Sequence, residues 1–130
     1  MNASPLLRRA LLLDAAASGA TGALMLLAAG PLADLTALPP GLLRAAGAVL
    51  VPYAGFVLWL GRQAAPVRGL VLAVIAINAL WAAESVAILA LGWVTPNALG
   101  GAFVLAQALV VAAFAGLQAA GLRGTAAVPA

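Results

Sequence analysis

The sequence predicts an all-α fold, in which a polytopic membrane protein forms an up-down-up-down bundle of four transmembrane helices. Of its 130 residues, 66% are hydrophobic and only 7% are charged, and the mean hydropathy is +1.18. The apolar residues fall into four runs that are each long enough to cross a bilayer. Because only short stretches separate these runs, residues 1–130 are expected to form one transmembrane domain.

The four apolar runs cover residues 10–29, 42–60, 69–91 and 98–120. Asp14 interrupts the first run and argues against a cleaved signal peptide, although that alternative stays open. Residues 30–41 carry proline and glycine at both ends, which predicts a loop with at most one helical turn. Pro52 lies inside the second run and predicts a kink there, because proline lacks a backbone N–H. Residues 121–130 are expected to be a short flexible tail.

The composition excludes several classes of function. The chain has neither cysteine nor histidine, which removes disulfides, thiolate or imidazole metal sites and histidine acid–base catalysis. A net charge of +3 is too sparse for a nucleic-acid footprint. The three acidic residues lie at different depths and offer no close catalytic pair. We therefore expect no catalytic residues, no metal, no cofactor and no nucleic-acid partner.

The arginines predict how the chain is oriented. All six basic residues are arginine, and Arg44 alone lies near the expected outer side of the membrane. The other five flank the runs on the opposite side: Arg8, Arg9, Arg62, Arg68 and Arg123. By the positive-inside rule, both termini and the loop between the second and third runs are expected to be cytoplasmic.

The most polar passage inside the apolar runs lies in the third run, around Glu84. At ~100° per residue, Asn78, Trp81 and Ser85 share one side of a helix, and Glu84 lies at the edge of this stripe. A carboxylate in hydrocarbon is costly, so Glu84 is a candidate functional residue. Arg44 lies at a compatible depth, which predicts an ion pair with Glu84. The predicted intramembrane polar cluster comprises Glu84, Arg44, Asn78, Ser85, Gln107 and Trp81.

This cluster allows more than one interpretation. A Glu84–Arg44 pair with a structural role would fix how two helices dock. Alternatively, Arg44 extends to the interface alone and leaves Glu84 neutral, or Glu84 gains and loses a proton at a coupling site. Trp81 near the middle of its run is interpreted as a packing anchor, or as the wall of a small pocket.

A second polar stripe lies in the first run. Asp14, Ser18 and Thr21 recur at helical spacing, so this helix is expected to turn a polar face toward protein. Asp14 is expected to lie within reach of the arginines of the second loop or of Gln118. The alternative is that Asp14 simply complements the positive end of a helix dipole.

Three segments carry a resemblance to known proteins. They are Leu-Arg-Arg-Ala-Leu-Leu-Leu-Asp at 7–14, Asn-Ala-Leu-Trp-Ala-Ala-Glu-Ser at 78–85 and Gly-Trp-Val-Thr-Pro-Asn-Ala-Leu-Gly at 92–100. With them, nearly the whole chain resembles small four-helix integral membrane proteins of bacteria. The resemblance implies the fold and a place in the bacterial cytoplasmic (inner) membrane, and it implies no activity. Small multidrug resistance transporters are similar in size, but the motif around their essential glutamate is not matched at Asp14.

The leading functional expectation is a non-enzymatic structural or accessory role. Such a protein would self-associate or dock on another membrane protein, and its other partner would be the lipid bilayer. The alternative is a small proton- or cation-coupled transporter or channel centred on Glu84. The uninterrupted third and fourth runs favour the accessory role, because many transporters break their helices at mid-membrane.

Overall fold

The computed structural model describes residues 2–125, and over this range the chain is all-helical. Four of its five helices are long and apolar enough to cross a membrane, which indicates a multi-pass membrane protein. These four are α1 (Pro5–Leu27), α3 (Pro40–Gly61), α4 (Arg68–Ala90) and α5 (Ala98–Gly124). The fifth, α2 (Ala29–Thr36), is short. The prediction of an all-α chain with four membrane-length helices is confirmed.

Helix ends differ from the predicted spans where capping groups decide them. The α1 helix begins five residues before the predicted start, because the Ser4 side chain accepts a hydrogen bond from the Leu7 N–H and Pro5 occupies the first helical position. The predicted loop at 30–41 instead contains most of α2. This helix ends at Thr36, and the next residue, Ala37, has a left-handed backbone conformation (φ 57°). The α5 helix extends to Gly124, and the rest of the predicted tail from residue 126 lies outside the described residues.

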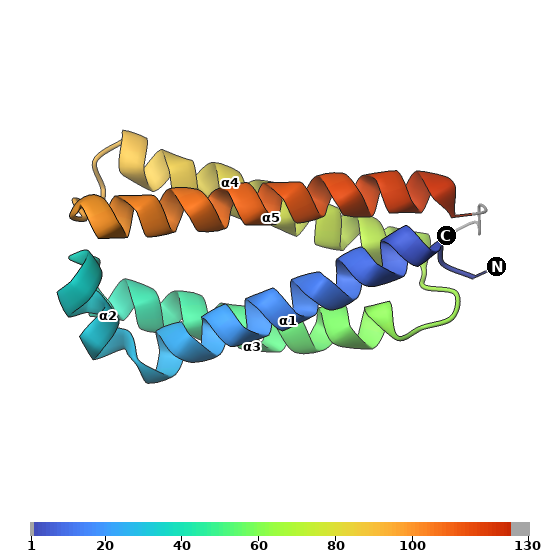
Figure 1. The fold of residues 1–130 in the computed structure, drawn as a ribbon, viewed down its shortest axis with the longest axis horizontal. Coiled ribbons are helices and arrows are strands. Elements are labelled where there is room, and N and C mark those ends of the chain that lie inside the picture. Colours follow the sequence, from blue (N-terminus) through green and yellow to red (C-terminus); the bar gives the residue numbers. More distant parts are fainter. Residues whose placement is uncertain (1, 126–130) are drawn as a thin grey trace.

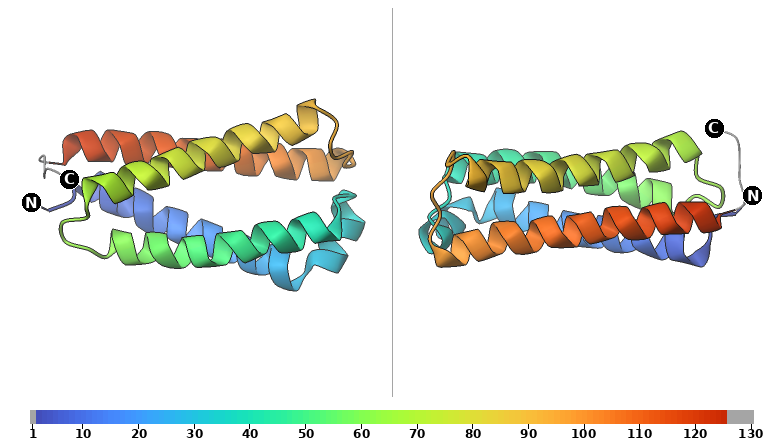
Figure 2. Two further views of the ribbon diagram at one scale, coloured as in Figure 1. Left: turned by 180° about the vertical axis from the view of Figure 1, so that it is seen from behind. Right: turned by 90° about the horizontal axis from the view of Figure 1, so that it is seen from above.

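The long helices lie side by side in an uneven arrangement (Figure 1). The α1 helix packs against α3 and α5, and α5 packs against α4. By contrast, α3 and α4 scarcely touch, and they diverge with distance from the connection between them (Figure 2). One side of the molecule is therefore less closed than the others.

Glycines allow α1 and α3 to approach closely. A Cβ atom on Gly47 would lie 2.6 Å from the carbonyl oxygen of Gly22, and one on Gly22 would lie 2.7 Å from the Cβ of Leu50. Real Cβ atoms do not tolerate such distances, so these positions require glycine. Pro52 lies on the exposed side of α3, which continues through it as one helix from Pro40 to Gly61.

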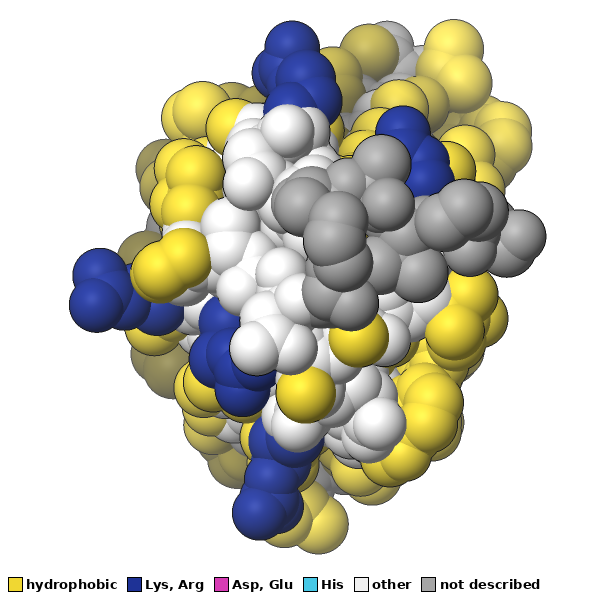
Figure 3. Space-filling model, turned by 90° about the vertical axis from the view of Figure 1, so that its right-hand side faces the viewer, with side chains coloured by type: hydrophobic (Ala, Val, Ile, Leu, Met, Phe, Trp, Pro, Cys, Tyr) yellow, Lys and Arg dark blue, Asp and Glu magenta, His cyan; other side chains and the backbone are white. Residues whose placement is uncertain are grey.

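The two ends of the molecule differ in charge. We call the end that carries the N-terminus and the α3–α4 connection the arginine end, and the opposite end the α2 end. Arginine side chains surround the arginine end (Figure 3). These side chains belong to Arg8, Arg9, Arg62, Arg68 and Arg123.

Two layers of buried apolar side chains lie along the helix axis. The layer nearer the arginine end includes Leu7, Leu11, Val57, Leu60, Val71, Val74 and Leu122. The layer nearer the α2 end includes Met25, Leu43, Leu50 and Val104. Between the two layers, each of the four long helices contributes a polar side chain to the interior.

Candidate functional site

The centre of the candidate site is the carboxylate of Asp14, which is fully buried about 14 Å along α1. Its Oδ1 atom accepts a hydrogen bond from the Ser18 hydroxyl (2.8 Å), one helical turn later. Its Oδ2 atom accepts hydrogen bonds from Nδ2 of Asn78 and Nε2 of Gln118 (both 2.8 Å) and lies 3.0 Å from the hydroxyl of Tyr53. These five residues, from all four long helices, are the Asp14 cluster.

The amide side chains of the cluster also bond each other. Nδ2 of Asn78 donates to Oε1 of Gln118 at 2.9 Å, and the Tyr53 hydroxyl lies 2.9 Å from Oδ1 of Asn78. Every buried side-chain nitrogen or oxygen of the described residues has a possible hydrogen-bond partner within reach. The cluster therefore satisfies polar groups that would be costly to bury singly.

The hydrogen bonds to Asp14 come from neutral side chains only. The predicted proximity to Gln118 is observed, whereas Arg62 and Arg68 are exposed at the arginine end and take no part in the cluster. Thr21 is half-buried and lines a pocket further along α1. The predicted stripe thus divides, with Asp14 and Ser18 in the cluster and Thr21 outside it.

A second hydrogen-bonded group, the Trp81 network, joins α4 to α5 nearer the α2 end. The indole N–H of Trp81 donates to Oε1 of Gln107 (2.9 Å), whose amide nitrogen donates to Oγ of Ser85 (2.9 Å). Ser85 in turn donates to the backbone oxygen of Trp81 (2.7 Å). Trp81, Ser85 and Gln107, which the sequence placed in one cluster, do lie together, but Asn78 belongs to the Asp14 cluster.

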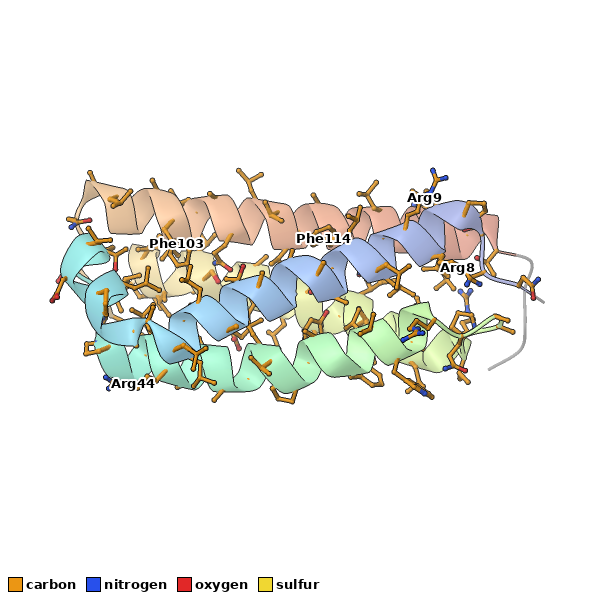
Figure 4. The ribbon with its side chains drawn as sticks, turned by 60° about the horizontal axis from the view of Figure 1, so that its bottom comes forward. Arg8, Arg9, Arg44, Phe103 and Phe114 are labelled. Atoms are coloured by element: carbon orange, nitrogen blue, oxygen red, sulfur yellow. The ribbon has the colours of Figure 1, made fainter. Side chains whose placement is uncertain are left out.

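Glu84 and Arg44 do not form the predicted ion pair in the described part of the chain. Both side chains are exposed. At ~100° per residue, Arg44 lies roughly 150° around α3 from the side that faces α4, and Figure 4 shows it pointing away from the other helices. Arg44 and Glu84 have similar depths in the membrane, but their side chains leave their helices in different directions, and this difference in direction separates the two charges.

One pocket, with a volume of about 290 Å³, is lined mainly by residues of α3 and α4, the two long helices that scarcely touch. We call it the α3–α4 pocket. Glu84 lies on it, while its deeper wall includes the Trp81 network. Its other lining residues are mostly apolar and include Met25, Leu42, Leu43, Ala46, Val49, Ile88, Phe103 and Val104.

Two smaller pockets lie between the Trp81 network and the Asp14 cluster. The α1–α5 pocket, of about 140 Å³, is lined by Ser18, Thr21, Gln107 and Phe114 among others. A third pocket, of about 30 Å³, is lined by Ser18, Tyr53 and Asn78 among others. Trp81 borders all three pockets, and Phe103 and Phe114 mark two different levels along α5 (Figure 4). The indole is therefore a partition between the α3–α4 pocket and the Asp14 cluster.

No known protein family, curated protein or solved structure matches the chain. The function is therefore argued from the two networks and the pockets.

Sequence reasoning missed Tyr53 as a site residue and named Gln118 only as a neighbour of Asp14. Tyr53 is the one tyrosine of the chain and lies inside an apolar run, where a hydroxyl needs a partner. Gln118 is a second amide on α5, eleven residues after Gln107, which is close to three helical turns. That spacing signals two polar levels on one face of α5.

Proposed function

We propose that this protein is a non-enzymatic accessory component of a membrane, which docks on another membrane protein through the α3–α4 pocket. In this proposal, α1, α3, α4 and α5 cross the bacterial cytoplasmic membrane as an up-down-up-down bundle. The arginine end is cytoplasmic, since it carries five of the six arginines. The α3–α4 pocket then opens sideways into the outer half of the bilayer.

The observation that carries the proposal is the exposed Glu84 on an apolar lateral pocket. By helix rise, Glu84 lies about 9 Å inside the end of α4. A carboxylate at this depth favours a cationic partner. The apolar walls suit bulky aliphatic side chains from a neighbouring transmembrane helix. A partner helix with a basic residue in its outer half complements both features.

Charge placement favours a different membrane protein over a second copy. In a symmetric dimer formed through the α3–α4 pocket, both subunits present the same surface. Arg44 does not line that pocket and points away from the other helices (Figure 4), so a second copy brings no cation to Glu84. The partner is therefore expected to differ in sequence.

The interior polar groups support a role without catalysis. Asp14 is the one acidic residue of its cluster, and its neighbours are amides and hydroxyls that bond it. The Trp81 network contains no acidic or basic side chain. Both groups connect helices, as expected for a rigid scaffold.

Site-specific photo-cross-linking in native membranes tests the proposal. A photoreactive residue at Val49, which is 57% exposed and lines the α3–α4 pocket, should give one discrete cross-linked product. The matched control is Leu109 on α5, which is 72% exposed and lines none of the three pockets. Glu84→Gln should lower the yield at Val49 several-fold, because the charge pairing is removed.

Each outcome of this experiment is informative. A product at Val49 with the mass of two copies would show that the chain binds a second copy of itself through this pocket, and not a different protein. Equal products at Val49 and Leu109, or lipid adducts alone at both, would overturn docking through this pocket.

A second candidate, proton- or cation-coupled transport, is favoured by one observation. Ser18 bonds the buried Asp14 carboxylate and also lines the α1–α5 pocket. This candidate places the coupling carboxylate at Asp14 in place of Glu84. Proteoliposomes under imposed proton, sodium and chloride gradients test it, with Asp14→Asn as the variant and Glu84→Gln as the control. Flux in the wild-type protein that Asp14→Asn abolishes would support transport. Wild-type flux at the level of protein-free vesicles would rule this candidate out.

A further inference from the structure

The Tyr53 hydroxyl has one hydrogen and two acceptors within reach. Its oxygen lies 3.0 Å from Oδ2 of Asp14 and 2.9 Å from Oδ1 of Asn78. A hydroxyl donates only one hydrogen bond, so it can serve only one of the two oxygens at a time. The amide nitrogens do not supply the missing hydrogen. Asn78 already donates to Asp14 and Gln118, and the amide nitrogen of Gln118 donates to Asp14.

When Asp14 is ionised, one acceptor of the cluster is left without a donor. The charged carboxylate is the stronger acceptor, so the Tyr53 hydrogen points to Oδ2. Ser18 then donates to Oδ1, and both amides donate to Oδ2. Oδ1 of Asn78 faces the oxygen of Tyr53 with no hydrogen between them.

When Asp14 is protonated on Oδ1, the conflict disappears. The new hydrogen lies between Oδ1 and the Ser18 oxygen, which are 2.8 Å apart. Ser18 then turns its own hydrogen toward a carbonyl of the preceding helical turn, an ordinary arrangement for helical serine. Oδ2 keeps its two amide donors, and the Tyr53 hydrogen moves to Asn78. Every polar atom of the cluster has a partner in this form.

The groups that face Asp14 from each helix are all neutral in their ordinary forms. They are Ser18 on α1, Tyr53 on α3, Asn78 on α4 and Gln118 on α5. Tyr53 is the one titratable member besides Asp14. The negative charge is therefore stabilised by hydrogen bonds without a counter-ion, which makes uptake of a proton the alternative way to neutralise it.

The structure leaves room for water on one side of Ser18, the residue that bonds the buried carboxylate. The α1–α5 pocket, at about 140 Å³, is large enough for several water molecules. Ser18 and Thr21 give such water polar partners, and Ser18 also bonds Asp14. Toward the arginine end, the apolar layer with Leu11, Val57 and Val71 closes the interior. The α1–α5 pocket is therefore the expected route for the proton.

From these observations we infer that Asp14 is a reversible proton-binding site. The proton comes from water in the α1–α5 pocket, binds Oδ1 and returns to that water on release. Each binding event turns the Tyr53 hydroxyl from Asp14 to Asn78, which changes the link between α1, α3 and α4. The inference does not depend on the docking proposal.

The composition makes this inference directly measurable by infrared spectroscopy. The chain has three acidic residues and one tyrosine, so the variant Asp34→Asn/Glu84→Gln keeps Asp14 as its only acidic side chain. Both removed carboxylates are exposed. Carboxyl-¹³C aspartate assigns the band of a protonated carboxyl to Asp14, and ring-labelled tyrosine reports on Tyr53. Spectra are recorded on the full chain in lipid from about pH 2 to about pH 10, which brackets the ordinary pKa of a carboxyl group and ends near that of tyrosine.

The expected result is a ¹³C-sensitive carboxyl band that disappears as the pH rises, with a shift of the tyrosine band at the same midpoint. Tyr53→Phe should retain the carboxyl titration, which keeps the test valid if Asp14→Asn fails to fold. In folded Asp14→Asn, both signals should be absent. A carboxyl band that stays constant over the whole range would overturn proton binding at Asp14. A tyrosine band that does not shift at the midpoint of the carboxyl band would overturn the turning of the Tyr53 hydroxyl.

Discussion

The side-chain nitrogen of Gln118 lies 2.8 Å from Oδ2 of Asp14, although 104 positions separate the two residues. This contact requires α5 to lie close to α1, and Gly121 allows it. A Cβ atom on Gly121 would lie 2.6 Å from both the Cα and the backbone nitrogen of Leu7. The buried hydrogen bond therefore depends on a residue that has no polar side chain.

Gly121→Ala should push α5 away from α1 and weaken the Gln118–Asp14 bond. Backbone atoms of Leu7 cannot yield as a flexible side chain can, so we expect a loss of about 1–3 kcal/mol in the free energy of unfolding. Reversible unfolding in detergent measures it. The control is Gly116→Ala, where an added Cβ meets nothing within 4 Å. Equal stability of the two variants would contradict the close contact.

Asp14→Leu should be among the most destabilising substitutions in the chain. It leaves the donors of Ser18, Asn78 and Gln118 without the carboxylate that they now share. Each unsatisfied buried group costs about 1–3 kcal/mol, so a total loss of about 3 kcal/mol or more is expected. Asp14→Asn should cost less, because its amide oxygen still accepts. The order of the two denaturation midpoints checks this, and the reverse order would contradict the cluster.

Glu84→Gln should leave stability nearly unchanged. The side chain is exposed and has no ion-pair partner in residues 2–125, so the free energy of unfolding should change by no more than about 0.5 kcal/mol. Thermal unfolding of the purified protein measures it beside Asp14→Asn. A large loss in the isolated chain would show that Glu84 has an internal partner after all.

Trp81→Phe should open the partition between the pockets. The substitution removes the hydrogen bond from Nε1 to Oε1 of Gln107 and also reduces the side-chain volume. Interhelical hydrogen bonds in membranes contribute about 0.6 kcal/mol on average, so a loss of about 1 kcal/mol is expected once the added cavity is included. Faster hydrogen–deuterium exchange of the Asn78 and Gln118 side-chain amides, measured by NMR, would show the opening. Unchanged exchange would mean that Trp81 does not separate the α3–α4 pocket from the cluster.

The sequence by itself determined the four membrane-length helices, because hydropathy and chain length are local properties of each run. It also determined contacts within one helix, such as the bond from Ser18 to Asp14, since helical spacing alone brings residues four apart together. Trp81, Ser85 and Gln107, which the predicted cluster included together with Glu84, Arg44 and Asn78, lie in one network.

Only the tertiary structure decided which polar side chains meet across helices. Depth along a helix follows from counting residues, but rotation about the helix axis depends on what the helix packs against. Arg44 matched Glu84 in depth and yet points away from the other helices. Tyr53 and Gln118 reach Asp14 because close approaches at glycines such as Gly22 and Gly121 set the neighbours of α1. Those approaches are packing outcomes, which no local pattern of the sequence specifies.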